Sequence, residues 1–252
     1  MEKSWKGRLA FLLLAFALPW VIRAADPALL SAQGRAFIQA DGDIDTLPDV
    51  EEAPMVALTF DDGPRRSTTG KLLEGLARRG VHATFFLVGE MAEGNDDLIS
   101  DMAAQGHQIG VHTYEHVWLT DLSAADFQRQ VSRTRELIRG MVGEGSYFLR
   151  PPYGGVDTGV EKRSNSPIIL WSVDPEDWKD KDVERIVNHI LSNVRDGDII
   201  LLHDIYQSSV EAALRVVDEL HERGFLFGTV EELAQYRHVE LENGKVYRCF
   251  YP

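Results

Sequence analysis

The chain contains one stretch that decides how it folds, Thr59-Phe60-Asp61-Asp62-Gly63-Pro64. It directly follows the apolar run Met55-Val56-Ala57-Leu58, which is typical of a parallel strand buried on both faces. Two adjacent carboxylates therefore stand at the carboxyl end of a strand, and Gly63 and Pro64 then force a turn. Active sites of α/β proteins lie at this end of the sheet. Taken alone, the same stretch also fits an aspartate pair that caps a helix.

Strand-like and helix-like segments alternate around and beyond this stretch. Strands are predicted at residues 55–60, 82–88, 108–112, 147–150, 167–173, 198–203 and 225–229. Amphipathic helices are predicted between most of them, at residues 69–79, 123–139, 182–194 and 210–222. Such alternation predicts parallel strands joined by crossover helices. Seven strands favour a closed or nearly closed barrel over an open sheet.

The composition excludes several classes of function. The 252 residues include 26 basic and 40 acidic side chains, which gives a net charge of −14. Nucleic-acid binding depends on contacts from Lys and Arg to phosphate, so a nucleic-acid partner is not expected. The same charge disfavours docking on anionic lipid. The one cysteine, Cys249, permits no internal disulfide, and its place near the C-terminus favours packing over a role as nucleophile.

The first 25 residues are typical of an export signal. Basic residues near the start precede an apolar run over residues 9–22, which is the layout of a secretory signal. This run is short for a membrane span, which takes about 20 residues. The residues before Ala25 make a poor cleavage site, so an uncleaved membrane anchor is the alternative. We therefore predict that residues 1–25 export the protein, which is then secreted or stays anchored outside the cytoplasm.

The rest of the chain is expected to divide into three parts. Residues 26–52 are acidic and lack periodicity, which predicts a linker. A globular domain is expected over residues 53–236, and residues 237–252 form a polar tail. Within this tail, residues 241–247 contain the turn pair Asn243-Gly244, which predicts a short hairpin.

A second polar cluster follows a predicted strand, His112-Thr113-Tyr114-Glu115-His116. Two imidazoles four residues apart are a common way to chelate one divalent metal, although most such pairs are structural or surface histidines. A carboxylate from Asp61 or Asp62 would complete a set of two histidines and one aspartate, with positions left open for water and substrate. An open set of this kind is typical of a catalytic metal.

Five motifs follow one another over residues 53–235, and each is weak alone. They are Thr59-Phe60-Asp61-Asp62-Gly63-Pro64, His112-Thr113-Tyr114-Glu115-His116, Arg150-Pro151-Pro152-Tyr153-Gly154, Asp174-Pro175-Glu176-Asp177-Trp178 and Leu202-His203-Asp204. Together and in this order they resemble the polysaccharide deacetylases of carbohydrate esterase family 4, the NodB-homology domain. The resemblance implies an α/β fold, a distorted (β/α) barrel of about seven parallel strands. It also implies a metal-dependent hydrolase that acts on carbon–nitrogen bonds other than peptide bonds.

The resemblance also assigns roles to the motif residues. It makes Asp62, His112 and His116 the ligands of one divalent ion, zinc in the first place and cobalt or nickel as alternatives. It makes Asp61 the general base and His203 the general acid. The supporting residues are Arg150 beside Asp61, Asp177 beside His203, the backbone N–H of Tyr153 as oxyanion donor, and Pro152, Tyr153, Trp178 and Leu202 as walls of the substrate pocket.

The implied substrate is an acetylated glycan polymer or oligosaccharide. Export favours N-acetylglucosamine of cell-wall peptidoglycan. Chitin, chitooligosaccharides and O-acetylated xylan are alternatives, and a non-catalytic glycan-binding protein on the same fold is the alternative of a different class. A membrane-tethered structural protein is a third class. The segment between Tyr153 and Trp171 is short for a full helix, so a stunted helix is expected in that wall of the barrel.

Overall fold

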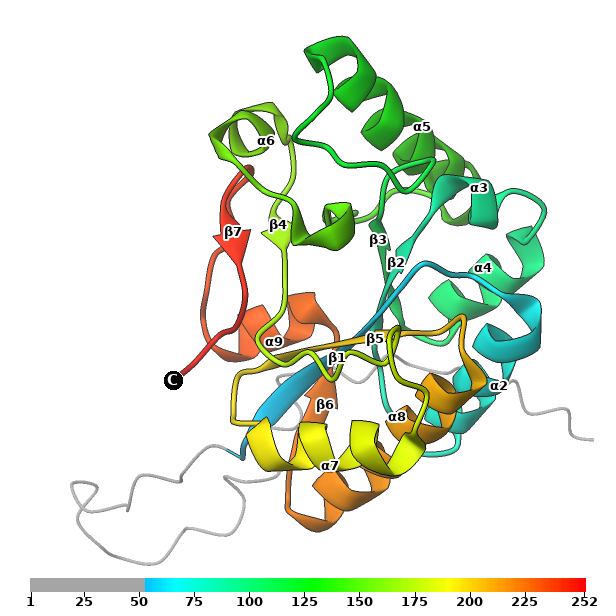
Figure 1. Ribbon diagram of the computed structural model, residues 1–252, viewed down its shortest axis with the longest axis vertical. Helices are drawn as coiled ribbons and strands as arrows, with labels where there is room; N and C mark the ends of the chain where they lie inside the picture. The colour runs from blue at the N-terminus through cyan, green and yellow to red at the C-terminus, as the bar shows by residue number, and fades with distance from the viewer. Residues whose placement is uncertain (1–52) are drawn as a thin grey trace, which may run out of the picture. The chain divides into compact units, whose positions relative to one another are not determined.

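A computed structural model describes residues 53–252 of the chain (Figure 1). The predicted export segment (residues 1–25) and the predicted linker (residues 26–52) both lie outside the described residues. In the part that is described, none of the helices combines the length and the apolar character that crossing a bilayer requires.

A parallel sheet forms the centre of the fold. Its middle strand, β1 (Met55–Asp61), is buried along its whole length, as its apolar sequence requires. It pairs in parallel with β2 (Thr84–Leu87), β5 (Ile199–His203) and β6 (Leu226–Gly228). The edge strand β3 (Gln108–Val111) pairs with β2. The order is therefore β3-β2-β1-β5, with β6 beside the start of β1 (Figure 1).

Single bridges link the two edges of this sheet. Leu149 bridges to Val111 at the end of β3 and to Ile168 of the two-residue strand β4 (Ile168–Ile169). A third bridge joins Val173 to β5. The strand segments thus follow one another around a ring, and near β4 they are connected by single β-bridges only. This arrangement is the distorted barrel that was predicted. Each of the seven predicted strands contains paired residues.

Helices surround the sheet (Figure 1). They are α2 (Arg66–Ala77), α3 (Gly89–Ala92), α4 (Asp96–Ala104), α5 (Ala124–Val142), α6 (Thr158–Arg163), α7 (Val183–Asn193), α8 (Gln207–Glu222) and α9 (Val230–Tyr236), with a 3₁₀ turn η2 (Pro152–Gly154). The four predicted helices correspond to α2, α5, α7 and α8. Ser123 and Asp182 cap α5 and α7 by accepting from backbone N–H groups in the first turn. The stunted helix expected after Tyr153 is α6, which has six residues.

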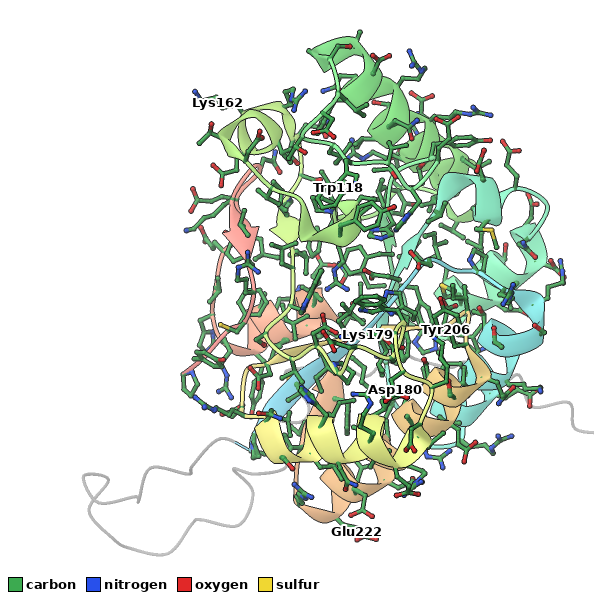
Figure 2. The ribbon with its side chains drawn as sticks, viewed as in Figure 1. Trp118, Lys162, Lys179, Asp180, Tyr206 and Glu222 are labelled. Carbon is green, nitrogen blue, oxygen red and sulfur yellow. The ribbon has the colours of Figure 1, made fainter. Side chains whose placement is uncertain are left out.

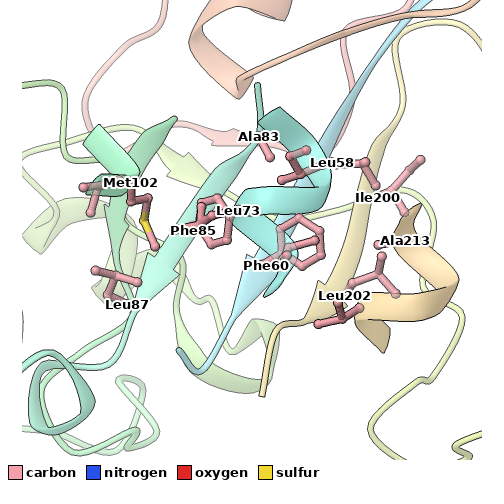
Figure 3. Packing of buried hydrophobic residues seen from close by; sticks show 14 of the residues in the cluster. Leu58, Phe60, Leu73, Ala83, Phe85, Leu87, Met102, Ile200, Leu202 and Ala213 are labelled. Atoms are coloured by element: carbon pink, nitrogen blue, oxygen red, sulfur yellow. The ribbon is translucent and has the colours of Figure 1, made fainter. Parts of the chain in front are cut away.

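The core lies between the sheet and these helices (Figure 3). Phe60 of β1 stacks on Phe85 of β2 with 5.2 Å between ring centroids. Leu202 of β5 and Ala213 of α8 belong to the same buried cluster. Phe60 and Leu202, which precede Asp61 and His203 on their strands, are both buried, and the pairing of β1 with β5 places Asp61 opposite His203.

The C-terminal tail pairs differently from the prediction. Asn243 and Gly244 form a turn, but β7 (Val246–Tyr247) pairs in parallel with β4 and not with residues before the turn. The predicted hairpin is therefore wrong. The physical reason is that β4 has an open edge, and the backbone of β7 satisfies it through bonds such as Leu170 N–H to Tyr247 O at 2.8 Å. The ring of Tyr247 also joins a buried cluster, so the tail packs against the rest of the domain.

Candidate active site

The structure brings Asp62, His112 and His116 together at the carboxyl end of the sheet. One ligand atom from each residue lies within 4.8 Å of the other two. The Nε2 atom of His116 is 3.1 Å from Asp62 Oδ1, and the Nε2 atom of His112 is 3.5 Å from the same oxygen. Asp62 follows β1 and His112 follows β3, so parallel strands on either side of β2 deliver all three groups to one place.

Hydrogen bonding fixes which nitrogen of His112 faces Asp62. Its Nδ1 atom lies 2.7 Å from the carbonyl oxygen of Arg150, which can only accept. Nδ1 therefore carries the hydrogen, and Nε2 keeps its lone pair toward Asp62. Burial lowers the pKa of His112 and outweighs the opposing charges of Asp61 and Asp62, so the imidazole is neutral. Neutral imidazole is the form that binds divalent metals.

Asp62 supplies the negative charge of this group. Burial opposes its ionisation, but the nearby His116, His112 and His203 outweigh burial and lower the pKa of Asp62 to about 2. Its Oδ1 atom is buried and accepts no hydrogen bond from the described residues. A buried carboxylate oxygen that faces two imidazole nitrogens is costly unless a cation lies between them. The donor set therefore fits a divalent metal ion.

Asp61 contacts a different partner, Arg150. The guanidinium of Arg150 is fully buried. Its Nη1 atom donates to Asp61 Oδ1 at 2.8 Å and to Thr59 Oγ1 at 2.7 Å. Its other nitrogens donate to the backbone carbonyls of Ile169 and Leu170, at the end of β4 and directly after it. The second oxygen of Asp61, Oδ2, lies 3.7 Å from His112 Nε2. One oxygen of Asp61 is thus held by Arg150 while the other faces His112.

His203 ends β5, and Asp177 holds it in place. His203 Nδ1 lies 2.7 Å from Asp177 Oδ1, and the backbone N–H of His203 donates to Asp177 Oδ2 at 2.9 Å. Burial alone would lower the pKa of His203, but the hydrogen bond and charge of Asp177, with smaller contributions from Asp61 and Asp62, raise it to about 9. His203 is therefore a cationic imidazole whose Nε2 lies 4.0 Å from Asp62 Oδ2.

A cleft of about 380 Å³ opens over these groups. Tyr153 and Trp178 line it together with Asp61, Asp62, His112, His116 and His203. Three further residues that line it were not assigned a role from the sequence, namely Trp171, Asp174 and Leu201. The cleft therefore joins a charged floor to an aromatic wall.

Two of the predicted wall residues do not line this cleft. Leu202 is fully buried in the core, where it shares a cluster with Ala213 (Figure 3). Side chains alternate along a strand, so Leu201, and not Leu202, shares a face of β5 with His203. Pro152, the first residue of the η2 turn, is also buried. Leu202 and Pro152 therefore lie behind the residues that line the cleft, and their role as walls of the substrate pocket stays a prediction.

Unusual backbone angles cluster in the loops that carry the motifs. A positive φ is uncommon for residues other than glycine, and such residues concentrate at functional sites. Five of the six described examples belong to motifs: Asp62 (73°), Thr113 (62°), His116 (52°), Tyr153 (60°) and Glu176 (53°). The sixth is His238. The loops are therefore shaped by the requirements of the site more than by local backbone preference.

Helices supply supports for the site that the sequence did not reveal. Gln130 of α5 accepts the backbone N–H groups of Tyr114 and Glu115 at 3.0 and 2.9 Å, and so fixes the loop between the two histidines. Ser209 of α8 donates to Asp177. Each of these residues is one of several polar side chains on its helix. No regular spacing in the sequence relates it to the motif that it supports.

A buried carboxylate lies behind the Asp61-Asp62-Gly63 turn. Asp204 is fully buried, and burial raises its pKa to about 7. It accepts a hydrogen bond from Thr69 of α2. A Cβ atom added to Gly63 would lie 2.4 Å from Asp204 Oδ1, so only glycine fits at this position of the turn.

Comparison with known proteins agrees with this geometry. The family model for polysaccharide deacetylase matches residues 49–166. The peptidoglycan-N-acetylmuramic acid deacetylase PdaC of Bacillus subtilis is 36% identical over 73% of this chain. The match spans 39% of PdaC, so this chain covers well under two thirds of that relative.

A second relative is matched over more of its length. A peptidoglycan-N-acetylglucosamine deacetylase of Bacillus cereus is 37% identical, and the match covers 71% of this chain and 68% of the relative. Among solved structures, the T48 deacetylase with substrate superimposes with a TM-score of 0.74 and 37% identity, over 77% of this chain and 96% of that one. The similarity thus includes both sequence and fold.

Proposed function

Because the chain belongs to the polysaccharide deacetylase family, we propose that it hydrolyses acetamido groups of a glycan to acetate and a free amine. One observation carries this proposal. A carboxylate held by Arg150 and an imidazole held by Asp177 lie in one cleft with the Asp62, His112 and His116 set. A base, an acid and a metal-binding set are the groups that hydrolysis of an amide requires.

We infer that Asp62, His112 and His116 hold one divalent ion, with zinc ahead of cobalt or nickel because two imidazoles and one carboxylate suit zinc. When bound, such an ion polarises the acetyl carbonyl and lowers the pKa of a coordinated water toward about 7.

The chain's own residues then act in two steps. Asp61, whose other oxygen is held by Arg150, takes a proton from the attacking water, and the new carbon–oxygen bond forms. The backbone N–H of Tyr153 donates to the carbonyl oxygen as negative charge develops there. His203 then gives its proton to the amide nitrogen, the carbon–nitrogen bond breaks, and acetate and a free amine leave. Trp178 forms a wall against the acetyl methyl group.

The proposed substrate is N-acetylglucosamine within peptidoglycan. The predicted export segment and the names of both relatives support peptidoglycan, and the name of the Bacillus cereus relative supports N-acetylglucosamine as the sugar. Chitooligosaccharides are the second candidate, because they contain the same acetylated sugar. The test is to incubate the full chain with peptidoglycan, chitooligosaccharides and acetylxylan, and to measure acetate release with and without added zinc. Zinc-dependent release from peptidoglycan is expected, and binding without any release would identify a glycan-binding protein instead.

Removal of one ligand tests the metal set. In the His116→Ala variant we expect zinc affinity to fall about 100-fold and acetate release to fall with it, because a carboxylate and one imidazole remain. Zinc content after dialysis, measured by atomic absorption, checks this expectation. His189→Ala, a change at a surface histidine of α7, is the matched control and should bind zinc like the unchanged protein. Full zinc occupancy in His116→Ala would show that the ligand set is wrong.

The N-terminal segment gives a separate prediction about location. We propose that residues 1–25 carry the protein across the membrane, with cleavage near Ala25 or retention as an anchor. Fractionation of the native host, followed by N-terminal sequencing, is expected to find the protein outside the cytoplasm. A cytoplasmic protein that retains residues 1–25 would contradict the proposal.

A further inference from the structure

One exposed tryptophan, Trp118, lies just outside the cleft and next to its aromatic wall. Trp118 is 46% exposed, which is close to the values for Trp178 (49%) and Tyr153 (54%). Trp178 and Tyr153 line the cleft, whereas Trp118 does not, and it lies beside the η2 turn (Figure 2). Exposed aromatic surface next to a cleft is typical of a binding site, because solvent exposure of so large an apolar side chain has no benefit for folding.

A stack of rings connects Trp118 to the metal-binding residues. The indole stacks on Tyr153 with 4.5 Å between ring centroids and 20° between ring planes. Tyr153 in turn meets the ring of His116 at 4.7 Å with 70° between planes. The hydroxyl of Tyr153 donates to the carbonyl oxygen of His116 at 3.4 Å. Tyr153 thus stands between His116 and Trp118, and Trp118 lies one ring further from the reacting groups.

The loop that carries Trp118 is anchored on the domain. The next residue, Leu119, is fully buried in the core. Arg163 of α6 donates to the carbonyl oxygens of Leu119 and Leu122 at 3.3 and 2.7 Å. A Cβ atom added to Gly155 would lie 2.7 Å from the Cε3 atom of Trp118, so the indole packs closely on a glycine backbone. The indole is therefore held ready for a ligand, which lowers the entropy lost on binding.

We propose that Trp118, supported by Tyr153, forms an outer sugar subsite for the glycan. It would receive the sugar next to the one whose acetyl group is removed. This inference rests on the proposed function, since it takes the cleft as the place of the acetylated sugar. Aromatic faces carry partial negative charge, and the C–H groups on one face of a pyranose ring pack against them.

The position of Trp118 decides which occupant this subsite takes. Its indole extends the aromatic wall of the cleft by one ring. A group bound on Trp118 therefore lies directly beside a group bound over His116. Successive sugars of one glycan chain meet this condition without a second molecule. The consequence is a preference for longer oligosaccharides, because a single acetylated sugar in the cleft leaves Trp118 uncovered.

Binding without turnover tests the outer sugar subsite. In the full chain with the Asp61→Asn change, dissociation constants of the N-acetylglucosamine monomer and pentamer are measured by isothermal titration calorimetry. Trp118→Ala is expected to weaken pentamer binding about tenfold more than monomer binding, because only the pentamer covers the indole. Trp118→Phe retains an aromatic face and should lose only about twofold. Leu226→Ala removes an equally exposed apolar side chain from β6 and should leave both constants unchanged.

The outcomes separate the subsite from the proposed function. Equal weakening of monomer and pentamer in Trp118→Ala would overturn the subsite and assign Trp118 a structural role. Thermal unfolding of Trp118→Ala and Trp118→Phe checks that both variants remain folded. Suppose that the unchanged protein releases no acetate, but Trp118→Ala weakens pentamer binding selectively. The subsite then stands and the proposed function fails. If the unchanged protein releases acetate and Trp118→Ala retains the full preference for the pentamer, the proposed function stands and the subsite fails.

Discussion

Replacing Asp61 by asparagine should lower kcat for acetate release by a factor of about 10²–10⁴ while zinc stays bound. The amide cannot take a proton from the attacking water, which is the role proposed for the carboxylate. Zinc should remain because Asp62, not Asp61, has the buried oxygen that faces both imidazoles. Asp61 instead gives one oxygen to Arg150.

The same change should also weaken the fold. Arg150 is fully buried, and Asp61 is its one carboxylate partner among the described residues. Breaking a buried ion pair on one side typically costs about 3–5 kcal/mol. Urea unfolding will measure this loss, and kcat must be compared at a temperature where both proteins are folded.

Zinc content decides between the two aspartates. Asp61→Asn should retain zinc and lose turnover, whereas the matched variant Asp62→Asn should lose both. The opposite pattern, with zinc lost from Asp61→Asn and kept in Asp62→Asn, would mean that the two roles have been assigned the wrong way round.

The sequence predicted the strands and long helices because their signals are local. The apolar run of β1 and the amphipathic pattern of α7 each depend on the residues of one segment. The short helix α9 was missed although its signal was present. Thr229 and Glu232 form a capping box, with each side chain accepting from the other's backbone N–H. A search for that pattern would have found the start of this helix.

The parts that escaped prediction depend on contacts across the fold. Strand β7 pairs with β4, far away in the chain, and so the local Asn-Gly signal for a hairpin was misleading. The choice between Leu201 and Leu202 requires knowing which face of β5 looks into the cleft. Ser209 reaches Asp177 from another helix, and nothing in the sequence near either residue indicates this.

Replacing His203 by alanine should lower kcat on N-acetyl substrates by about 10²–10⁴-fold. An amide nitrogen is a poor leaving group until it is protonated, and His203 is the proposed donor. Acetate esters depend less on this proton because an alkoxide leaves more easily, so the loss on acetylxylan should be smaller. The ratio of kcat on chitooligosaccharide to kcat on acetylxylan measures this difference. An equal loss on both substrates would argue for a structural role of His203.

The pH–rate profile then tests why His203 keeps its proton. Burial lowers the pKa of His203, whereas Asp177 outweighs burial and raises it to about 9. Activity should therefore fall at alkaline pH as His203 loses its proton. A bound cation offsets the contributions of Asp61 and Asp62 but leaves the hydrogen bond to Asp177 in place. In Asp177→Asn, burial still lowers the pKa of His203, but no carboxylate at position 177 opposes it. The alkaline limb of the pH–rate profile should therefore move to lower pH, toward or below the ordinary histidine value of 6.5.

Stability should follow the same titration. The pKa of His203 is raised in the folded state, so its pair with Asp177 stabilises the fold fully below the unfolded value of 6.5, and this contribution is lost as pH rises toward 9. The Asp177→Asn variant should lack that dependence. Urea unfolding between pH 6 and pH 10 would measure it, with Ser209→Ala as a variant that removes one hydrogen bond to Asp177 but keeps its charge. If the alkaline limb and the stability profile of Asp177→Asn both match those of the unchanged protein, the proton that leaves with the amine comes from a group other than His203.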